Sequence, residues 1–316
     1  MKITAGLGSA DEYIRFVEAG ADEFFSGFVP YSWTEKYGTV MPLNRREVLC
    51  YHVQLGAFSE LEIFVRNDSE IQKAGTSDIQ FPVLYSTAVS GDRGDHRELY
   101  ELGFMSYIIA DPALIVYLRE KGIPCEIHMS GEMGEINRRT VEVFQRLDLK
   151  RVIFHRKNSF EDMQSVICSE RTAGGRRAET EFEAFVLNEM CQFTGAFCNS
   201  LHCDELGHLC RVPYWTEPVR DESEDEDATV PKYDDNGYLC GATGCGLCAL
   251  YRLRDAGITH LKLVGRGNYT DFMEKDIRNL KTALEILENT DTEAAFRTEM
   301  KKQIFPYGCS GNCYYL

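Results

Sequence analysis

Short apolar segments rich in β-branched and aromatic residues alternate along the chain with amphipathic helical segments. This alternation is typical of βα units and predicts a parallel sheet. Several helical segments end at a small residue and a glycine that lead directly into the next strand, as in AGADEFF, LGFMSYII, KGIPCEI and AGITHLKL. The eight predicted strands are Ile3–Leu7, Glu23–Phe28, Gln80–Tyr85, Tyr107–Ala110, Cys125–Met129, Val152–His155, Ala184–Leu187 and His260–Val264.

Eight strands are the number that closes a (β/α)8 barrel, and 316 residues fit one such domain. The predicted helices include Ala10–Ala19, Arg97–Leu102, Ala113–Glu120, Tyr251–Ala256 and Tyr269–Leu287. The rival architecture is an open doubly wound sheet, which usually carries a glycine-rich phosphate turn after its first strand. The turn Gly6–Ser9 lacks the third glycine and the later acidic partner of that motif. We therefore expect an α/β fold, a TIM-like barrel.

The predicted barrel covers residues 1–287, and a Cys-containing tail covers 288–316. Between the seventh and eighth strands lies a long cysteine-rich insertion, residues 191–250, which carries seven of the twelve cysteines. An insertion of this length in a compact domain is usually functional or disordered. The insertion also carries an acidic run, residues 221–227, which we expect to be a solvated linker rather than a docking element for a partner.

Composition narrows the class of protein. An apolar fraction of 44% with 27% charged residues is that of a globular chain. The net charge of −16 disfavours nucleic-acid binding, which needs clustered Lys and Arg. No segment predicts a membrane helix or a signal peptide, so we expect a cytoplasmic protein without membrane contact. Cytosolic thiols stay reduced, so twelve cysteines indicate metal or cluster ligation rather than disulfides.

Four cysteines of the insertion, Cys191, Cys198, Cys203 and Cys210, form the strongest constellation. Thiolates gathered in one loop can bind an iron–sulfur cluster, which commonly takes four cysteines. Zinc is the alternative, although structural zinc more often shows paired knuckles, and these four cysteines are not paired in that way.

A second group, Cys240, Cys245 and Cys248, has the C-x4-C-x2-C spacing of plant-type ferredoxins. That spacing needs one more distant cysteine, either Cys309 or Cys313. The group could form a second metal site, or it could supply spare ligands to the first. The remaining thiols, Cys50, Cys125 and Cys168, are expected in the core or in helices.

The pattern E-x-F-x5-C-x6-C, formed by Glu183, Phe185, Cys191 and Cys198 and followed by CRVPY at Cys210, resembles the signature block of peptidase family U32. GSADEYIRFVEAGADEFFSG resembles that family's opening strand–helix–strand, IIADPALIVYLREKGIPCEIHMSGEM its middle, and AGITHLKLVGR its closing K-I-E-G-R strand. The resemblance extends over residues 1–287.

The resemblance implies a TIM-like barrel with a cysteine-bound [4Fe–4S] cluster at its mouth. Family members were first named as peptidases or collagenases, and others act in oxygen-independent hydroxylation of ubiquinone precursors or in hydroxylation of ribosomal and transfer RNA. By position, Cys191, Cys198 and Cys210 match family ligands, and Cys203 replaces a ligand that usually lies closer to the last one. The chain departs from the pattern at Leu187–Asn188, where the family has His-Gly, at Val264, where it has Glu, and in the ending CSGNC.

Polar residues at the carboxyl ends of the predicted strands are the candidate reactive groups, because the active site of a barrel lies there. His128 is the best general acid or base, since imidazole titrates near neutral pH. Arg156 and Lys157 could clamp an anionic group. The expected catalytic residues are Asp111, His128, Ser130, Glu132 and Arg156, and His155, Lys157, Asn188, Glu189 and Arg266 lie at the same edge.

The sequence thus predicts a cluster-dependent enzyme, a U32-type oxidoreductase that performs oxygen-independent hydroxylation or a related redox modification. Hydrolysis is the weaker mechanism, because the chain has neither H-E-x-x-H nor G-x-S-x-G. An RNA-modifying enzyme would need a local basic patch, for which Arg171, Arg176 and Arg177 are the candidates. A non-catalytic iron–sulfur or zinc subunit, bound to a partner of the same family, is a further alternative, and an electron donor is a further expected partner.

Overall fold

The computed structural model describes residues 1–9, 11–27, 80–86 (backbone alone), 101, 103–134, 136–188, 232–265 and 268–315. Eight parallel strands form a closed barrel in chain order, with β1 paired to both β2 and β8. The strands are β1 (Lys2–Gly6), β2 (Glu23–Gly27), β3 (Gln80–Ser86), β4 (Ser106–Ile109), β5 (Glu126–Met129), β6 (Leu149–Phe154), β7 (Glu181–Leu187) and β8 (His260–Leu263).

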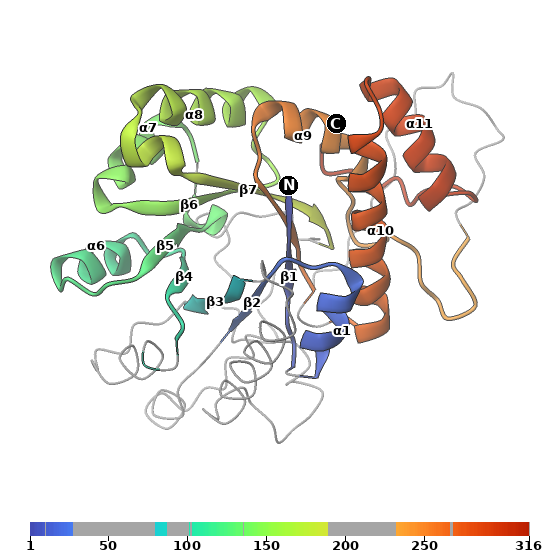
Figure 1. Ribbon diagram of the computed structural model, residues 1–316, viewed down its shortest axis with the longest axis horizontal. Helices are drawn as coiled ribbons and strands as arrows, with labels where there is room; N and C mark the ends of the chain where they lie inside the picture. Colours follow the sequence, from blue (N-terminus) through green and yellow to red (C-terminus); the bar gives the residue numbers. More distant parts are fainter. Residues whose placement is uncertain are drawn as a thin grey trace.

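Helices surround the strands on the outside, as Figure 1 shows for α7, α8, α10 and α1. They are α1 (Glu12–Ala19), α6 (Pro112–Glu120), α7 (Arg138–Phe144), α8 (Phe160–Ala173), α9 (Leu250–Ala256), α10 (Thr270–Glu288) and α11 (Glu293–Ile304), with short 3-10 turns η1 (Gly131–Met133), η2 (Gln145–Leu147), η3 (Gly175–Glu179) and η5 (Leu247–Ala249). Local sequence fixes their ends: Ser159 and Asp162 form a capping box that starts α8. Gly257, with φ of 96°, ends α9.

The structure confirms the eight predicted strands and the barrel, because each predicted segment overlaps an observed strand and β8 closes onto β1. A doubly wound sheet would have left two open edges. The expected helix at 97–102 falls almost wholly outside the described residues. Of the cysteine-rich insertion, residues 191–231 lie outside the described part of the chain, and residues 232–250 are described.

An ionic network fills the interior of the barrel. Arg151 of β6 donates to Glu23 of β2 (Nη2 to Oε1, 3.1 Å) and to Glu183 of β7 (Nη1 to Oε2, 2.8 Å). Lys262 of β8 donates to Glu183 (Nζ to Oε1, 2.9 Å), and the Nε2 atom of His260 lies 3.1 Å from Glu23. Strands β2 and β6 are not neighbours in the sheet, so contacts between them cross the barrel.

An apolar layer lies one step nearer the carboxyl ends of the strands. Phe25, Ile108, Ile153 and Phe185 form a buried cluster of their own, against which Val264 packs. Phe25, Ile153 and Phe185 lie two positions after Glu23, Arg151 and Glu183 on the same strands. Because side chains alternate along a strand, each of the three points into the barrel like the charged residue before it. The ionic network therefore lies beneath an apolar layer, as seen from the mouth of the barrel, by which we mean the carboxyl ends of its strands.

The expected tail contains a further helix, α11, whose Phe296 and Met300 are fully buried. The residues after α11 return to the barrel, and the chain ends beside α9 and α11 (Figure 1). Cys245 forms an antiparallel bridge with Leu187 at the end of β7 and a parallel bridge with Cys313. Within the described residues, no helix has the length and apolar character needed to cross a membrane.

Candidate functional site

The turns after β5 and β6 build one side of the mouth. Ser130 is buried, and its hydroxyl accepts the N–H of Glu132 at 3.2 Å, which starts η1. Gly131 lets η1 lie against β6, since a Cβ at this position would lie 2.9 Å from the backbone nitrogen of His155. After β6, Asn158 accepts the N–H of His155 at 3.1 Å and fixes the second turn. The two turns therefore form one packed unit.

This unit brings three polar side chains together. The N–H of Lys157 donates to Nδ1 of His155 at 3.2 Å, which leaves the Nε2 atom of the ring for the other two side chains. That Nε2 lies 4.0 Å from Oε1 of Glu132 and 3.3 Å from a guanidinium nitrogen of Arg156. His155 and Arg156 are buried, whereas the Glu132 side chain is 26% exposed. A carboxylate, an imidazole and a guanidinium at one edge can move a proton and hold an anion.

Two of the expected catalytic residues, His128 and Asp111, do not belong to this group of three side chains. His128 is buried inside the barrel beside the ionic network, not at the mouth. Burial there, reinforced by the charge of Arg151, holds the pKa of His128 well below its usual value. Asp111 caps α6, where its carboxylate accepts the N–H of Ala113 at 2.8 Å. Glu189 and Arg266 fall outside the described residues.

Asn188, at the end of β7, belongs to a buried polar group that the sequence did not indicate. With φ of 70° it donates to Oδ2 of Asp276 on α10 at 2.8 Å. Tyr238 donates to the other oxygen of Asp276 at 2.7 Å, and the Cys240 thiol also bonds to this carboxyl. Burial raises the pKa of Asp276 to about 6. The one signal of this group in the sequence is Asp276, an acidic residue on the apolar face of α10.

The last two described residues reach the mouth. Tyr314 packs against the apolar layer of the barrel interior. The Tyr315 hydroxyl donates to the carbonyl of Phe185 at 2.8 Å, and its ring lies 5.4 Å from that of Phe160. Gly244 makes this approach possible, because a Cβ there would overlap the Tyr314 ring. The aromatic chain end therefore covers part of the mouth.

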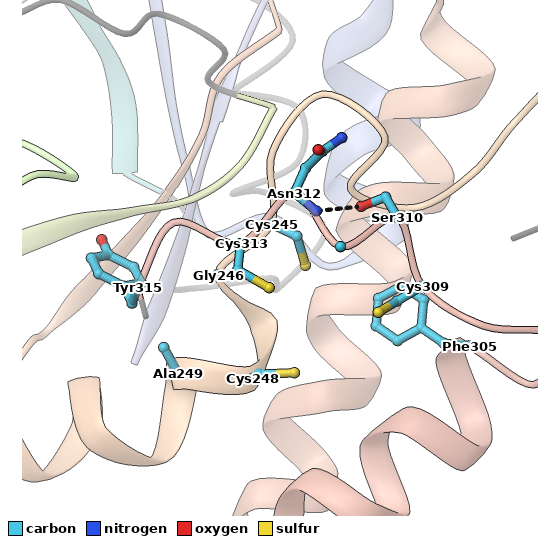
Figure 2. A pocket seen from close by; sticks show the side chains of 11 residues that line it. Cys245, Gly246, Cys248, Ala249, Phe305, Cys309, Ser310, Asn312, Cys313 and Tyr315 are labelled. Atoms are coloured by element: carbon cyan, nitrogen blue, oxygen red, sulfur yellow. Dashed lines mark hydrogen bonds between the residues drawn. The ribbon is translucent and has the colours of Figure 1, made fainter. Parts of the chain in front are cut away.

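Four cysteines line one pocket between the η5 turn and the chain end. Figure 2 shows the sulfur atoms of Cys245, Cys248, Cys309 and Cys313 directed toward the same space. We expected Cys240 beside these four, but its thiol instead hydrogen-bonds to the Asp276 carboxyl group. Both candidate distant cysteines, rather than one, reach the pocket. The first four predicted ligands, Cys191, Cys198, Cys203 and Cys210, lie outside the described residues.

Burial shifts the pKa of two of the pocket thiols above the usual cysteine value. Burial raises the pKa of Cys245 to about 12, although the N–H of Leu247 bonds to its sulfur and opposes this shift. Burial also raises the pKa of Cys313, and the charges of Lys301 and Arg297 on α11 oppose it. Without a metal these two thiols are therefore neutral at pH 7, and ligation would displace their protons.

The candidate basic patch lies away from the mouth. Arg177 pairs with Glu170 (Nε to Oε2, 3.0 Å), and Arg171 lies over the Phe182 ring. Both arginines come before β7, at the amino ends of the strands. The Arg176 side chain is outside the described part of the structure. Arg171 and Arg177 thus have structural partners and do not face the mouth.

Comparison with curated proteins gives a match over part of the chain. Over 104 residues the chain is 29% identical to tRNA hydroxylation protein P of Escherichia coli (strain K12). That alignment covers 33% of this chain and 21% of the relative, so the chain matches about a fifth of that protein's length.

Solved structures resemble the chain more distantly. The structure of the U32 peptidase Mk0906 covers 59% of this chain and 69% of its own at 17% identity, with a TM-score of 0.36. The YdjI aldolase from Escherichia coli K12 covers 98% of this chain and 92% of its own at 10% identity, with a TM-score of 0.39. The family model described as peptidase family U32 matches residues 92–314, which is more than half of the chain. The chain therefore belongs to peptidase family U32.

Proposed function

We propose that the protein is a U32-type enzyme that hydroxylates a substrate at the mouth of the barrel without using O2. The observation that carries the proposal is the match to a tRNA hydroxylation protein within a chain of family U32. In the reaction, a substrate C–H bond breaks and a C–O bond forms. The oxygen atom comes from a small oxygen-donor molecule, which is reduced by two electrons and leaves as the deoxygenated product.

The mouth residues suit a role in binding and proton transfer. We assign Arg156 to the anionic group of the substrate or donor, because a guanidinium matches carboxylate and phosphate geometry. Glu132, partly exposed and 4.0 Å from His155, would take up or return a proton. Ser130, as a helix cap, positions Glu132. The imidazole of His128 would stay neutral and keep its place in the barrel interior.

A family-type iron–sulfur cluster would supply one-electron chemistry when bound. Its proposed ligands are Cys191, Cys198, Cys203 and Cys210, whose soft thiolates suit iron–sulfur chemistry, with zinc as the alternative metal. We assign no geometry to this group, because these residues lie outside the described part of the chain. The reaction as written balances in electrons, so an external electron donor or a second U32 chain would serve only to bring the cluster to its active oxidation state.

RNA is the substrate class that the named relative favours. The net charge of −16 and the placement of Arg171 and Arg177 weigh against extensive phosphate contact. An RNA substrate would therefore be held by a small contact area. Peptide hydrolysis is less favoured, because the chain carries neither the H-E-x-x-H nor the G-x-S-x-G motif.

The test is anaerobic expression of the full chain in a host that lacks its own U32 hydroxylases, followed by mass spectrometry of digested RNA. We expect a nucleoside heavier by one oxygen atom that is absent with Glu132→Gln and Arg156→Ala. Glu161→Gln, at an exposed position on α8, is the matched control and should retain the product. Unchanged RNA together with cleavage of a peptide library by the purified protein would contradict the proposal.

A further inference from the structure

The four pocket cysteines come as two close pairs from segments that are distant in sequence. Cys245 and Cys248 flank the start of η5 in a C-x2-C pair. Cys309 and Cys313 form a C-x3-C pair in the chain end that follows α11. Structural zinc sites typically use cysteine pairs separated by two to four residues. The two pairs therefore have the spacing of a four-cysteine zinc site.

Backbone contacts hold the two pairs against each other. The N–H of Cys245 donates to the Asn312 carbonyl at 2.8 Å, and the N–H of Tyr314 donates to the Cys245 carbonyl at 2.8 Å. Cys245 and Cys313 are thereby paired in a parallel bridge. Gly241, whose φ is 68°, allows this packing, because a Cβ there would lie 2.6 Å from the Cβ of Cys245. The backbone alone thus sets the relative position of the pairs.

The space between the four thiols has the size of a single-ion site. Figure 2 shows the sulfur atoms of both pairs directed toward the same space. The cavity that they line measures about 20 Å³, which holds about one water molecule. Phe305 and Ala249 supply apolar lining beside the thiols. The space therefore suits one ion rather than a multinuclear cluster.

Binding of an ion must draw the thiols inward. Among the described residues, no three Cys, His, Asp or Glu side chains already stand at metal-binding positions. Four thiolates on one zinc lie roughly 3.8 Å apart, given tetrahedral geometry and a Zn–S length of about 2.3 Å. A cysteine sulfur turns about one side-chain bond between staggered positions, so it can move while the backbone stays in place. We therefore expect side-chain rotation to complete the site when the ion binds.

The surroundings favour thiolates, which are the form of cysteine that binds zinc. Burial raises the pKa of Cys245, and the N–H of Leu247, which bonds to its sulfur, opposes that rise. Hydrogen bonds of this kind to a ligand atom support metal sites. Burial also raises the pKa of Cys313, and the charges of Lys301 and Arg297 on α11 oppose that rise. Each pair thus has a group beside it that stabilises negative charge on sulfur.

We propose that the four pocket cysteines bind one zinc ion, with Cys245, Cys248, Cys309 and Cys313 as its tetrahedral ligands. This site is separate from the group expected on the four cysteines of residues 191–210. Each thiol releases its proton when it binds zinc. Because four protein ligands fill the coordination sphere, the ion is structural. It fastens the chain end to the turn before α9 and so holds Tyr314 against the apolar layer of the mouth. The inference does not depend on the reaction that the enzyme catalyses.

The first test is zinc, iron and sulfide analysis of the full chain purified without oxygen. We expect the double variant Cys309→Ser/Cys313→Ser, the tail variant, to lose about one zinc ion per chain and no iron. Cys168→Ser, exposed on α8, is the matched control and should keep its zinc. Cys240→Ser should also keep its zinc, because that thiol bonds to Asp276 and not to the ion. Cys191→Ser should keep the zinc that the tail variant loses.

Four outcomes would overturn the proposal. The unchanged protein could hold no zinc, or the tail variant could keep all of its zinc. The tail variant could lose iron and sulfide instead, which would mean a cluster. Finally, Cys191→Ser could lose the same zinc, which would mean one shared site. Circular dichroism checks that the variants fold.

A second measurement uses the unchanged protein and so does not depend on a variant folding. Cys313 is exposed, so iodoacetamide should label it readily unless a metal holds its sulfur. We expect mass spectrometry to find the four pocket thiols protected and Cys168, which is also exposed, labelled. A zinc chelator under reducing conditions should then expose all four thiols together. Labelling of Cys309 and Cys313 before chelation would contradict the proposal.

Discussion

Inside the barrel, the ammonium group of Lys262 donates to Oε1 of Glu183 at 2.9 Å, and both side chains are buried. Glu183 belongs to the E-x-F signature, and Lys262 is the lysine of the closing KLVGR segment. Arg151 holds the other oxygen of Glu183 at 2.8 Å. These signature residues therefore fasten β6, β7 and β8 together beneath the mouth and do not themselves reach it.

Replacing Glu183 with Gln should destabilise the fold strongly, because Arg151 and Lys262 would lose the buried charge that balances them. We expect a loss of about 3 kcal/mol or more in the free energy of unfolding, measured by urea denaturation. The double variant Glu183→Gln/Lys262→Met should lose less than the sum of the two single variants. Additive losses would show that the pair is not coupled.

The same network should make the protein sensitive to acid. Lys262 and Arg151 hold the pKa of Glu183 below its usual value, against the effect of burial. A carboxyl whose pKa is lowered on folding contributes stability above its unfolded pKa, and this stability is lost as pH falls. The melting temperature should therefore fall below about pH 4.5, and Glu183→Gln should show a smaller fall.

His128 should contribute a second acid-sensitive step at higher pH. Burial and the nearby charges of Arg151 and Lys262 lower its pKa, and only Glu23 opposes them strongly. Below about pH 6.5 this histidine binds a proton in the unfolded chain but not in the folded chain. The free energy of unfolding therefore falls by about 1.4 kcal/mol per pH unit. His128→Gln should remove this slope between pH 6.5 and 5. An unchanged slope would mean that His128 is protonated in the folded protein.

The strands could be predicted from the sequence because each one is a short apolar segment that follows a helix and a glycine. The ionic interior was not predicted, since the alternating charges of Arg151 and Glu183 equally suit a half-exposed strand. The contact of Arg151 with Glu23 exists only once the barrel closes. Likewise, spacing could not choose between Cys309 and Cys313, whereas the fold brings both to one pocket.

Gly244 offers a way to displace the chain end. A side chain there would overlap the Tyr314 ring, and its φ of 134° disfavours any other residue. Gly244→Ala should raise hydrogen exchange in residues 309–315 and lower the melting temperature. Gly237→Ala is the matched control, because it has a φ of 77° and nothing within 4 Å of a new Cβ. Equal effects of the two variants would show that backbone strain alone is responsible.

Asp276 should give a pH dependence of the opposite sign. Burial raises its pKa from 3.8 to about 6, so between these pH values the folded protein holds more protons than the unfolded chain. A pKa raised on folding contributes stability that is lost as pH rises, here roughly 3 kcal/mol across about two pH units. Asp276→Asn cannot ionise, and its amide would meet a donor from Asn188 or Tyr238, so it should cost a fixed amount at every pH. Urea denaturation at several pH values should therefore find Asp276→Asn far less stable than the unchanged protein at pH 4 and much closer to it at pH 7. A constant gap would show that Asp276 does not change its ionisation between folded and unfolded states in this range.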